Sequence, residues 1–133
     1  MNYKFLVTGA TGFIGKRVVA LLLEKNIEVV ATDINIEEIK ESFVEYLKFK
    51  DVNDKKHLLT ELDISSNKNI EEVFSNANIT HIIACGYQMS NMIDANPVRA
   101  SEINILGLAN LFESVAKYKI KRMIFPSSQS VYG

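Results

Sequence analysis

The sequence has 133 residues, which suits one domain with a substantial hydrophobic core. Its 15 basic and 16 acidic residues are balanced, which argues against a nucleic-acid partner or an anionic membrane surface. Cys85 is the single cysteine, so an internal disulfide and a cysteine-based metal site are excluded. No apolar run approaches the roughly 20 residues of a membrane span, and residues 4–7 are too short for a signal peptide. We therefore expect one domain, residues 1–133, without a metal and in the cytoplasm.

A strand, a glycine-rich turn and a helix are expected in succession near the start of the sequence. A short apolar run leads into GATGFIG, residues 9–15, and an apolar helical pattern follows at residues 18–25. Gly9 permits a sharp turn, Gly12 lets the backbone approach a pyrophosphate, and Gly15 lets the helix pack closely on the strand. The first amides of such a helix lack intrahelical acceptors and bind anions. The stretch predicts a phosphate site, with a purely structural turn as the alternative.

Asp33 ends the second expected strand, residues 28–33, about 20 residues beyond the glycine turn. A carboxylate at this place can accept the ribose hydroxyls of an adenosine, and it repels a 2′-phosphate. No basic residue follows before Lys40, so NAD is favoured over NADP as the cofactor. The alternative is that Asp33 only caps the next helix, which is expected at residues 36–46.

The rest of the chain continues to alternate apolar strands with amphipathic helices. After a polar surface loop, three more strands and two helices are expected, the strands at residues 57–62, 80–85 and 122–125 and the helices at residues 69–75 and 98–119. This alternation predicts an α/β fold, a Rossmann-type doubly wound parallel sheet in the order 3-2-1-4-5, truncated after the fifth strand. A cofactor would lie across the carboxyl ends of the strands, between the first and the fourth.

Three motifs resemble one known family. The spacing GxxGxxG at residues 9–15 and the run SSxxVYG at residues 127–133 are similar to those of the extended short-chain dehydrogenases/reductases, the NAD-dependent sugar-nucleotide epimerases and dehydratases. The segment NILGLANL, residues 104–111, resembles the family's NxxGxxNL segment. The resemblance runs through nearly the whole chain in compatible order. A methyltransferase-like glycine loop is disfavoured, because it lacks the SSxxVYG partner.

The resemblance implies a set of cofactor contacts. Asp63 would accept a hydrogen bond from the adenine amine and Ile64 would pack on the ring, although an aspartate after a strand is also a common helix N-cap. The small residues where the fourth strand ends, Ala84, Cys85 and Gly86, would lie beneath the ribose and diphosphate, and Asn104 would order the active site. Cys85 itself is expected to be a small buried hydrophobe. The candidate cofactor-binding residues are Gly9, Thr11, Gly12, Phe13, Ile14, Gly15, Asp33, Ile34, Asp63, Ile64, Ala84, Cys85, Gly86, Gln88 and Asn104.

The resemblance also places the family's catalytic serine at Ser128, whose hydroxyl would hydrogen-bond the reacting substrate oxygen. The family needs a Tyr and a Lys in the pattern YxxxK one helix later, and this sequence stops before it, at Gly133. The pattern does occur at residues 46–50, but there it is interpreted as a helix end with snorkelling lysines. We therefore expect the chain to be the N-terminal half of an enzyme and to be inactive by itself.

Two departures leave the subfamily open. Gln88 stands where many epimerases carry a basic residue, and Pro126 replaces a Ser or Thr and so removes one donor. The chain could be the NAD-binding half of a nucleotide-sugar epimerase or dehydratase, a catalytically inactive NAD-binding module, or an NAD(P)-dependent reductase or redox-sensing regulator. Asp33 argues against members that prefer NADP. The uncovered edge of the fifth strand predicts self-association, for example as a homodimer.

Overall fold

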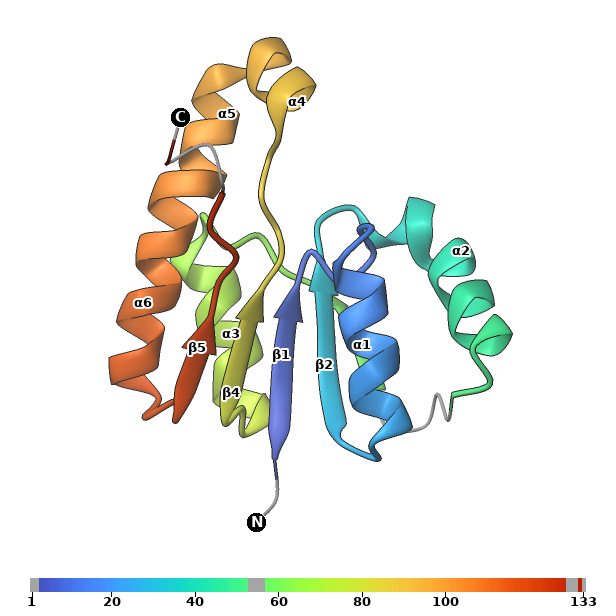
Figure 1. The fold of residues 1–133 in the computed structure, drawn as a ribbon. Coiled ribbons are helices and arrows are strands. Elements are labelled where there is room, and N and C mark those ends of the chain that lie inside the picture. Colours follow the sequence, from blue (N-terminus) through green and yellow to red (C-terminus); the bar gives the residue numbers. More distant parts are fainter. Residues whose placement is uncertain (1–2, 53–56, 129–131, 133) are drawn as a thin grey trace.

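Five parallel strands form one sheet in the order β3-β2-β1-β4-β5 in the computed structural model, which describes residues 3–52, 57–128 and 132 (Figure 1). β1 lies at the centre, where Val7 is in register with Ala31 of β2 and with Ile83 of β4. The predicted fold class and strand order are confirmed. The strands are β1 (Lys4–Thr8), β2 (Glu28–Asp33), β3 (His57–Glu61), β4 (His81–Ala84) and β5 (Arg122–Ile124).

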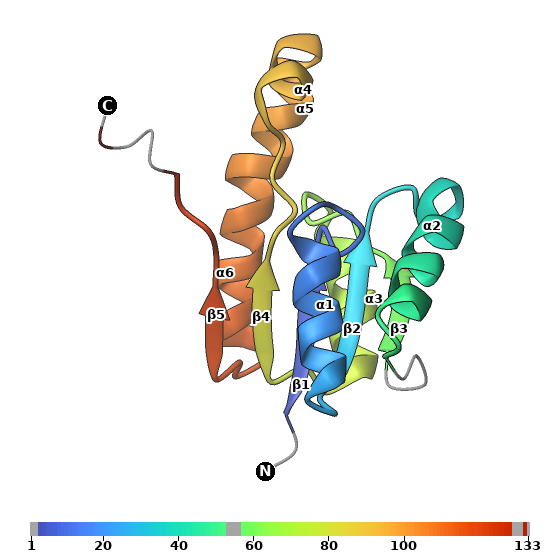
Figure 2. The same ribbon diagram turned by 45° about the vertical axis from the view of Figure 1, so that its right-hand side comes forward.

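Helices cover both faces of the sheet (Figures 1 and 2). In the described part of the chain, no helix is long and apolar enough to cross a membrane. The helices are α1 (Gly15–Glu24), α2 (Ile36–Phe49), α3 (Asn67–Ala77), α4 (Ser90–Ala95), α5 (Pro97–Ser101), the π-helix η2 (Glu102–Gly107) and α6 (Leu108–Lys117).

The sheet separates two hydrophobic cores, because successive side chains of a strand point to opposite faces. Leu6 packs with α3, η2 and α6 on one face, whereas Val7 packs with α1 and α2 on the other. The strands β1, β2 and β4 each contribute side chains to both cores. Because both faces of these strands are buried, their sequences are continuous apolar runs rather than alternating apolar and polar residues.

The structure corrects the long helix predicted at residues 98–119, which is divided into α5, η2 and α6. The structure also contains α4, a helix that the sequence did not predict. Asn96 separates α4 from α5 because the residue before a proline is disfavoured in the helical conformation, and its φ of −151° and ψ of 83° lie outside the helical region. Pro97 then begins α5, where its missing amide costs nothing, and the Asn96 side chain accepts a hydrogen bond from the amide of Arg99.

Other boundaries shift by a few residues. The first helix begins at Gly15 rather than at residue 18, because the glycine turn runs directly into it and the Gly12 carbonyl accepts from the amide of Lys16. The third helix begins at Asn67 rather than at residue 69, and Ser66 caps it. Residues 53–56 of the predicted surface loop lie outside the described residues.

Candidate nucleotide-binding site

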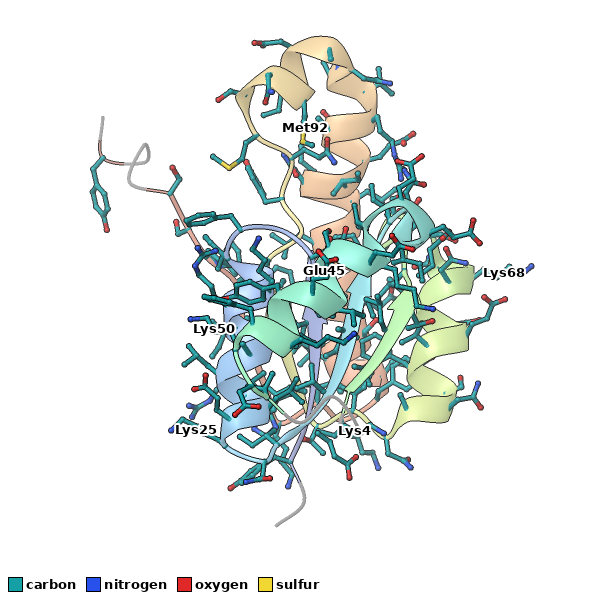
Figure 3. The ribbon with its side chains drawn as sticks, turned by 90° about the vertical axis from the view of Figure 1, so that its right-hand side faces the viewer. Lys4, Lys25, Glu45, Lys50, Lys68 and Met92 are labelled. Atoms are coloured by element: carbon teal, nitrogen blue, oxygen red, sulfur yellow. The ribbon has the colours of Figure 1, made fainter. Side chains whose placement is uncertain are left out.

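A pocket of about 280 Å³ opens at the carboxyl ends of the strands, across the point between β1 and β4 where the strand order reverses. This is the place where open α/β sheets bind their ligands. Met92 reaches it from α4, beyond the strand ends (Figure 3). The pocket is lined by Thr8, Gly9, Thr11, Gly12, Asp33, Ile34, Leu62, Asp63, Ile64, Cys85, Gly86, Tyr87, Gln88, Met92 and Ile103.

Each glycine of the first turn meets a different steric condition. Gly9 has a φ of +60°, and a Cβ there would lie 2.6 Å from the Cα of Gly86, so the sharp turn requires a glycine. A Cβ on Gly15 would collide with the carbonyl oxygen of Gly9. Gly15 therefore lets α1 pack on the turn itself, rather than on the strand as predicted. A Cβ on Gly12 would lie 3.3 Å from the carbonyl oxygen of Gly9, which is tighter than an ordinary contact but less severe than at Gly9 or Gly15.

The start of α1 presents free backbone donors. Within the described residues, the amides of Phe13, Ile14 and Gly15 donate no hydrogen bond to the protein, and no side chain caps the helix. These amides and the positive end of the dipole of this ten-residue helix suit an anion. The Phe13 and Ile14 side chains are 73% and 55% exposed and do not line the pocket, so any contact with a cofactor would come from their amides.

Asp33 joins the end of β2 to the glycine turn. Its Oδ2 accepts hydrogen bonds from the Thr11 amide (3.1 Å) and hydroxyl (2.5 Å), and its Oδ1 accepts from the Ile34 amide (2.9 Å). Asp33 does not cap α2, because the residue at that position is Asn35. A carboxylate has about four acceptor positions. One of them therefore remains available on Oδ1, at the wall of the pocket.

Asp63 is held by donors from two elements. The amide and hydroxyl of Ser65 donate to its Oδ1 (2.9 and 2.6 Å), and Arg99 of α5 donates to its Oδ2 (2.6 Å). Desolvation acts to raise the pKa of Asp63, but the hydrogen bonds from Ser65 and Arg99 and the guanidinium charge outweigh it and keep the pKa below the usual value. Since Ser66 caps α3, Asp63 is not the N-cap of that helix.

The NILGLANL segment packs against the wall of the pocket. The Asn104 side chain accepts from the amide of Gln88 (2.8 Å) and donates to its carbonyl (2.9 Å), so it fixes a lining residue without lining the pocket itself. A Cβ on Gly107 would lie 2.5 Å from Cγ1 of Ile64, and buried Asn110 donates to the Ile64 carbonyl (2.9 Å). Asn104 and Gly107 lie in the π-helical turn η2, a feature frequent at functional sites.

The three small residues at the end of β4 differ in their positions. Cys85 is half-buried and lines the pocket, which corrects the expectation of a fully buried residue, and burial raises the pKa of its thiol. Gly86 also lines the pocket, and its amide donates to the Thr8 hydroxyl (3.3 Å). Ala84 does not line the pocket; it packs against the core beneath α3 and α6.

The predicted catalytic residue lies outside the pocket. Ser128 is exposed, in the segment that leads away from the sheet after β5 (Figure 2). Residues 129–131 and 133 of the SSxxVYG run are outside the described residues. The YxxxK pattern at residues 46–50 lies at the end of α2. There Tyr46 packs against the core beneath α1 and α2, and the Lys16 ammonium lies 5.0 Å from the centroid of its ring.

Several lining residues and one anchoring residue were not foreseen. Thr8 and Leu62 directly adjoin predicted site residues in the sequence, so proximity could have indicated them. Tyr87 and Ile103 likewise adjoin the predicted residues Gly86 and Asn104, whereas Met92 depends on the placement of α4, which no local pattern indicates. Arg99 contacts Asp63 across a separation of 36 residues, and only the tertiary structure reveals this contact.

The sheet order, the glycine turn entering α1 and the carboxylate ending β2 define a Rossmann-type nucleotide-binding domain. Residues 5–133 match the NAD dependent epimerase/dehydratase family, and the chain belongs to this family. The predicted family and its cofactor, NAD, are therefore confirmed.

Three similar proteins illustrate the relationship. The chain is 34% identical to a bifunctional UDP-glucose 4-epimerase and UDP-xylose 4-epimerase from Arabidopsis thaliana, over 100% of this chain and 38% of the relative. It is 28% identical, with a TM-score of 0.76, to the UDP-glucose 4-epimerase of Thermus thermophilus in complex with NAD, over 94% of this chain and 37% of that one. A monomeric L-threonine 3-dehydrogenase from a metagenome is 26% identical, with a TM-score of 0.74, over 97% of this chain and 37% of that one. The chain thus spans less than two fifths of the length of these relatives.

Proposed function

We propose that this chain is the NAD-binding half of an NAD-dependent nucleotide-sugar epimerase or dehydratase. The observation that carries the proposal is the pocket at the switch between β1 and β4, which combines free amides at the start of α1 with the Asp33 carboxylate. The relatives named as UDP-glucose 4-epimerases support the nucleotide-sugar as the substrate class.

The pyrophosphate of NAD would lie at the start of α1, where the backbone at Gly12 leaves room for it. A hydroxyl of the adenosine ribose would donate to the acceptor position left on Asp33 Oδ1. A second ribose hydroxyl could reach the carboxylate only if the Thr11 hydroxyl turned away, because Oδ2 already accepts two hydrogen bonds. Adenine would lie against Asp63 and Ile64.

Held at this site, NAD would supply hydride transfer at a sugar carbon, with the cofactor regenerated within the turnover. The residues of this chain bind and orient the dinucleotide, and we propose that Ser128 hydrogen-bonds the reacting substrate hydroxyl in the full-length protein. The Tyr and Lys that the family uses as acid/base partners are not in residues 1–133, so we expect no turnover from this chain alone.

Substitution of Asp33 tests the proposal. Asp33→Ala should weaken NAD binding about 10- to 100-fold in calorimetric titration, since a hydrogen bond to a charged group contributes roughly 1.5–3 kcal/mol. Glu45→Ala is a matched control, because Glu45 is exposed on α2 away from the pocket (Figure 3). An unchanged affinity in Asp33→Ala would refute the ribose contact. A wild-type chain that binds no NAD would refute the proposal for this chain.

A dehydrogenase of the same superfamily is the second candidate, favoured by the similarity to an L-threonine 3-dehydrogenase. The two functions differ in their redox balance. An epimerase regenerates its cofactor within each turnover, whereas a dehydrogenase accumulates NADH. Net formation of NADH by the full-length protein would therefore favour the dehydrogenase, and tighter binding of NADP than of NAD would favour a reductase.

A further inference from the structure

Arg99 connects α5 to the turn between β3 and α3. Its Nη2 donates to Asp63 Oδ2 (2.6 Å), and its Nη1 donates to the Ser65 hydroxyl (2.8 Å) and to Glu102 Oε2 (3.1 Å). The planar guanidinium therefore holds Asp63, which lines the pocket, together with Ser65 beside it and Glu102 in η2. The side chain is about one third exposed, at 35%.

This arrangement determines what Asp63 can still accept. Oδ1 accepts two hydrogen bonds from Ser65 and Oδ2 accepts one from Arg99, so one of the roughly four acceptor positions remains, on Oδ2. A carboxylate held ionised in this way attracts a donor and repels an acceptor. At position 6, an amino purine offers a donor and a 6-oxo purine offers an acceptor. The 6-oxo purine carries its own donor at the neighbouring N1–H, so the carboxylate discriminates between the two bases only if it is held in line with position 6.

We propose that Arg99 is a positioning residue that orients Asp63 so that the pocket selects a 6-amino purine over a 6-oxo purine in its dinucleotide. The proposal rests on the proposed NAD-binding function. Without the bond from Arg99, only the hydrogen bonds from Ser65 to Oδ1 oppose rotation of the carboxylate about its terminal torsion, so the direction of Oδ2 is less firmly fixed. The preference for the amino group then weakens.

A purely structural role for Arg99 leads to a different expectation. If the guanidinium only joined α5 to the β3–α3 turn, its loss would lower the stability of the chain and weaken the binding of all dinucleotides equally. The ratio of affinities for two dinucleotides that differ only at position 6 of the purine therefore separates the two roles.

The experiment compares NAD with nicotinamide hypoxanthine dinucleotide, in which a 6-oxo group replaces the amine. We expect the wild-type chain to bind NAD at least about tenfold more tightly, as one well-formed hydrogen bond to a charged group allows. Arg99→Met should reduce this ratio at least about fivefold. The control is Lys68→Met, which removes the cation of an exposed ion pair with Glu72 on α3, pointing away from the molecule (Figure 3); it should leave the ratio unchanged.

The outcomes are distinguishable. A wild-type chain that binds neither dinucleotide refutes the NAD-binding function itself. Binding of NAD without preference, or an unchanged ratio in Arg99→Met, refutes the positioning role and leaves the NAD-binding function standing. If Arg99→Met does not fold, Arg99→Lys replaces it. A single ammonium group cannot reproduce the fork over Asp63 and Ser65, so the ratio should still fall at least about twofold, and an unchanged ratio refutes the proposal.

Discussion

At the scale of single residues, the pocket is bounded by two carboxylates that the protein itself orients. Asp33 accepts three hydrogen bonds from Thr11 and Ile34, and Asp63 accepts three from Ser65 and Arg99. Each carboxylate keeps one acceptor position, so each is prepared for one donor from a ligand. Because these side chains are already ordered, the entropic cost of binding a ligand is lower.

The ionisation of Asp63 should make the free energy of unfolding depend on pH in the acidic range. Its pKa is lowered on folding, so its stabilising contribution is full well above the unfolded value of 3.8 and is lost as the pH falls through the folded value. At pH 7, Asp63→Asn should reduce the free energy of unfolding by roughly 1–2 kcal/mol, because a charged hydrogen bond is lost in a partly exposed pair. Urea denaturation should show the difference from the wild type shrinking below pH 3.8.

Glu72→Gln provides the control for this pH series. Glu72 pairs with Lys68 at 4.0 Å on the exposed surface of α3, so its removal should change stability by no more than about 0.5 kcal/mol at any pH. A difference between Asp63→Asn and wild type that stays constant from pH 7 to acid would show that Asp63 does not titrate as its contacts imply.

At the scale of elements, the π-helical turn η2 approaches the end of β3 unusually closely. Gly107 has no side chain at the point where Ile64 lies against the helix, and Asn110, one turn later, donates to the Ile64 carbonyl. Asn104 meanwhile fixes Gln88, another residue of the pocket wall. One helical segment therefore sets the positions of two lining residues that are far apart in the sequence.

Gly107→Ala should test this close approach. An added Cβ would lie 2.5 Å from Cγ1 and 2.9 Å from Cδ1 of Ile64, so we expect a loss of about 1–3 kcal/mol in the free energy of unfolding. In an Ile64→Ala background the two side-chain contacts are gone and only a 3.3 Å contact with the backbone carbonyl carbon of residue 64 remains. The same substitution should then cost at least about 1 kcal/mol less, since helix propensity favours alanine over glycine by up to about 1 kcal/mol. A double-mutant cycle by urea denaturation measures the coupling.

The exposed residue Ala109 on α6 provides a propensity control for this cycle, since Ala109→Gly should cost about 1 kcal/mol in either background. Equal effects of Gly107→Ala with and without the Ile64 side chain would contradict the steric explanation.

At the scale of the whole molecule, an apolar patch lies beside β5, the last strand of the described sheet. The Phe112 and Phe125 rings meet edge to face, with their centroids 6.0 Å apart, and both side chains and that of Ile124 are about half exposed. An open strand edge next to exposed aromatic side chains favours pairing between copies. We therefore expect this chain to self-associate through the patch.

Sedimentation velocity over a range of concentrations should show a reversible increase in mass for the wild-type chain. The variant Phe112→Ser with Ile124→Thr should weaken the association at least about tenfold. Phe49→Ser is the control, because Phe49 is 82% exposed on α2, at the other end of the sheet. A wild-type chain that stays monomeric at every concentration would contradict the prediction.

The amino-acid sequence by itself determined the strands, their order and the glycine turn with Asp33 at the end of β2. These features depend on local physics: apolar runs bury both faces of a parallel sheet, a φ of +60° requires Gly9, and right-handed crossovers leave few topologies. The tertiary structure alone decided how α4, α5 and η2 complete the pocket. The bond from Arg99 to Asp63 and the contact of Gly107 with Ile64 join residues 36 or more positions apart, and such contacts depend on how packed elements meet rather than on any pattern along the chain.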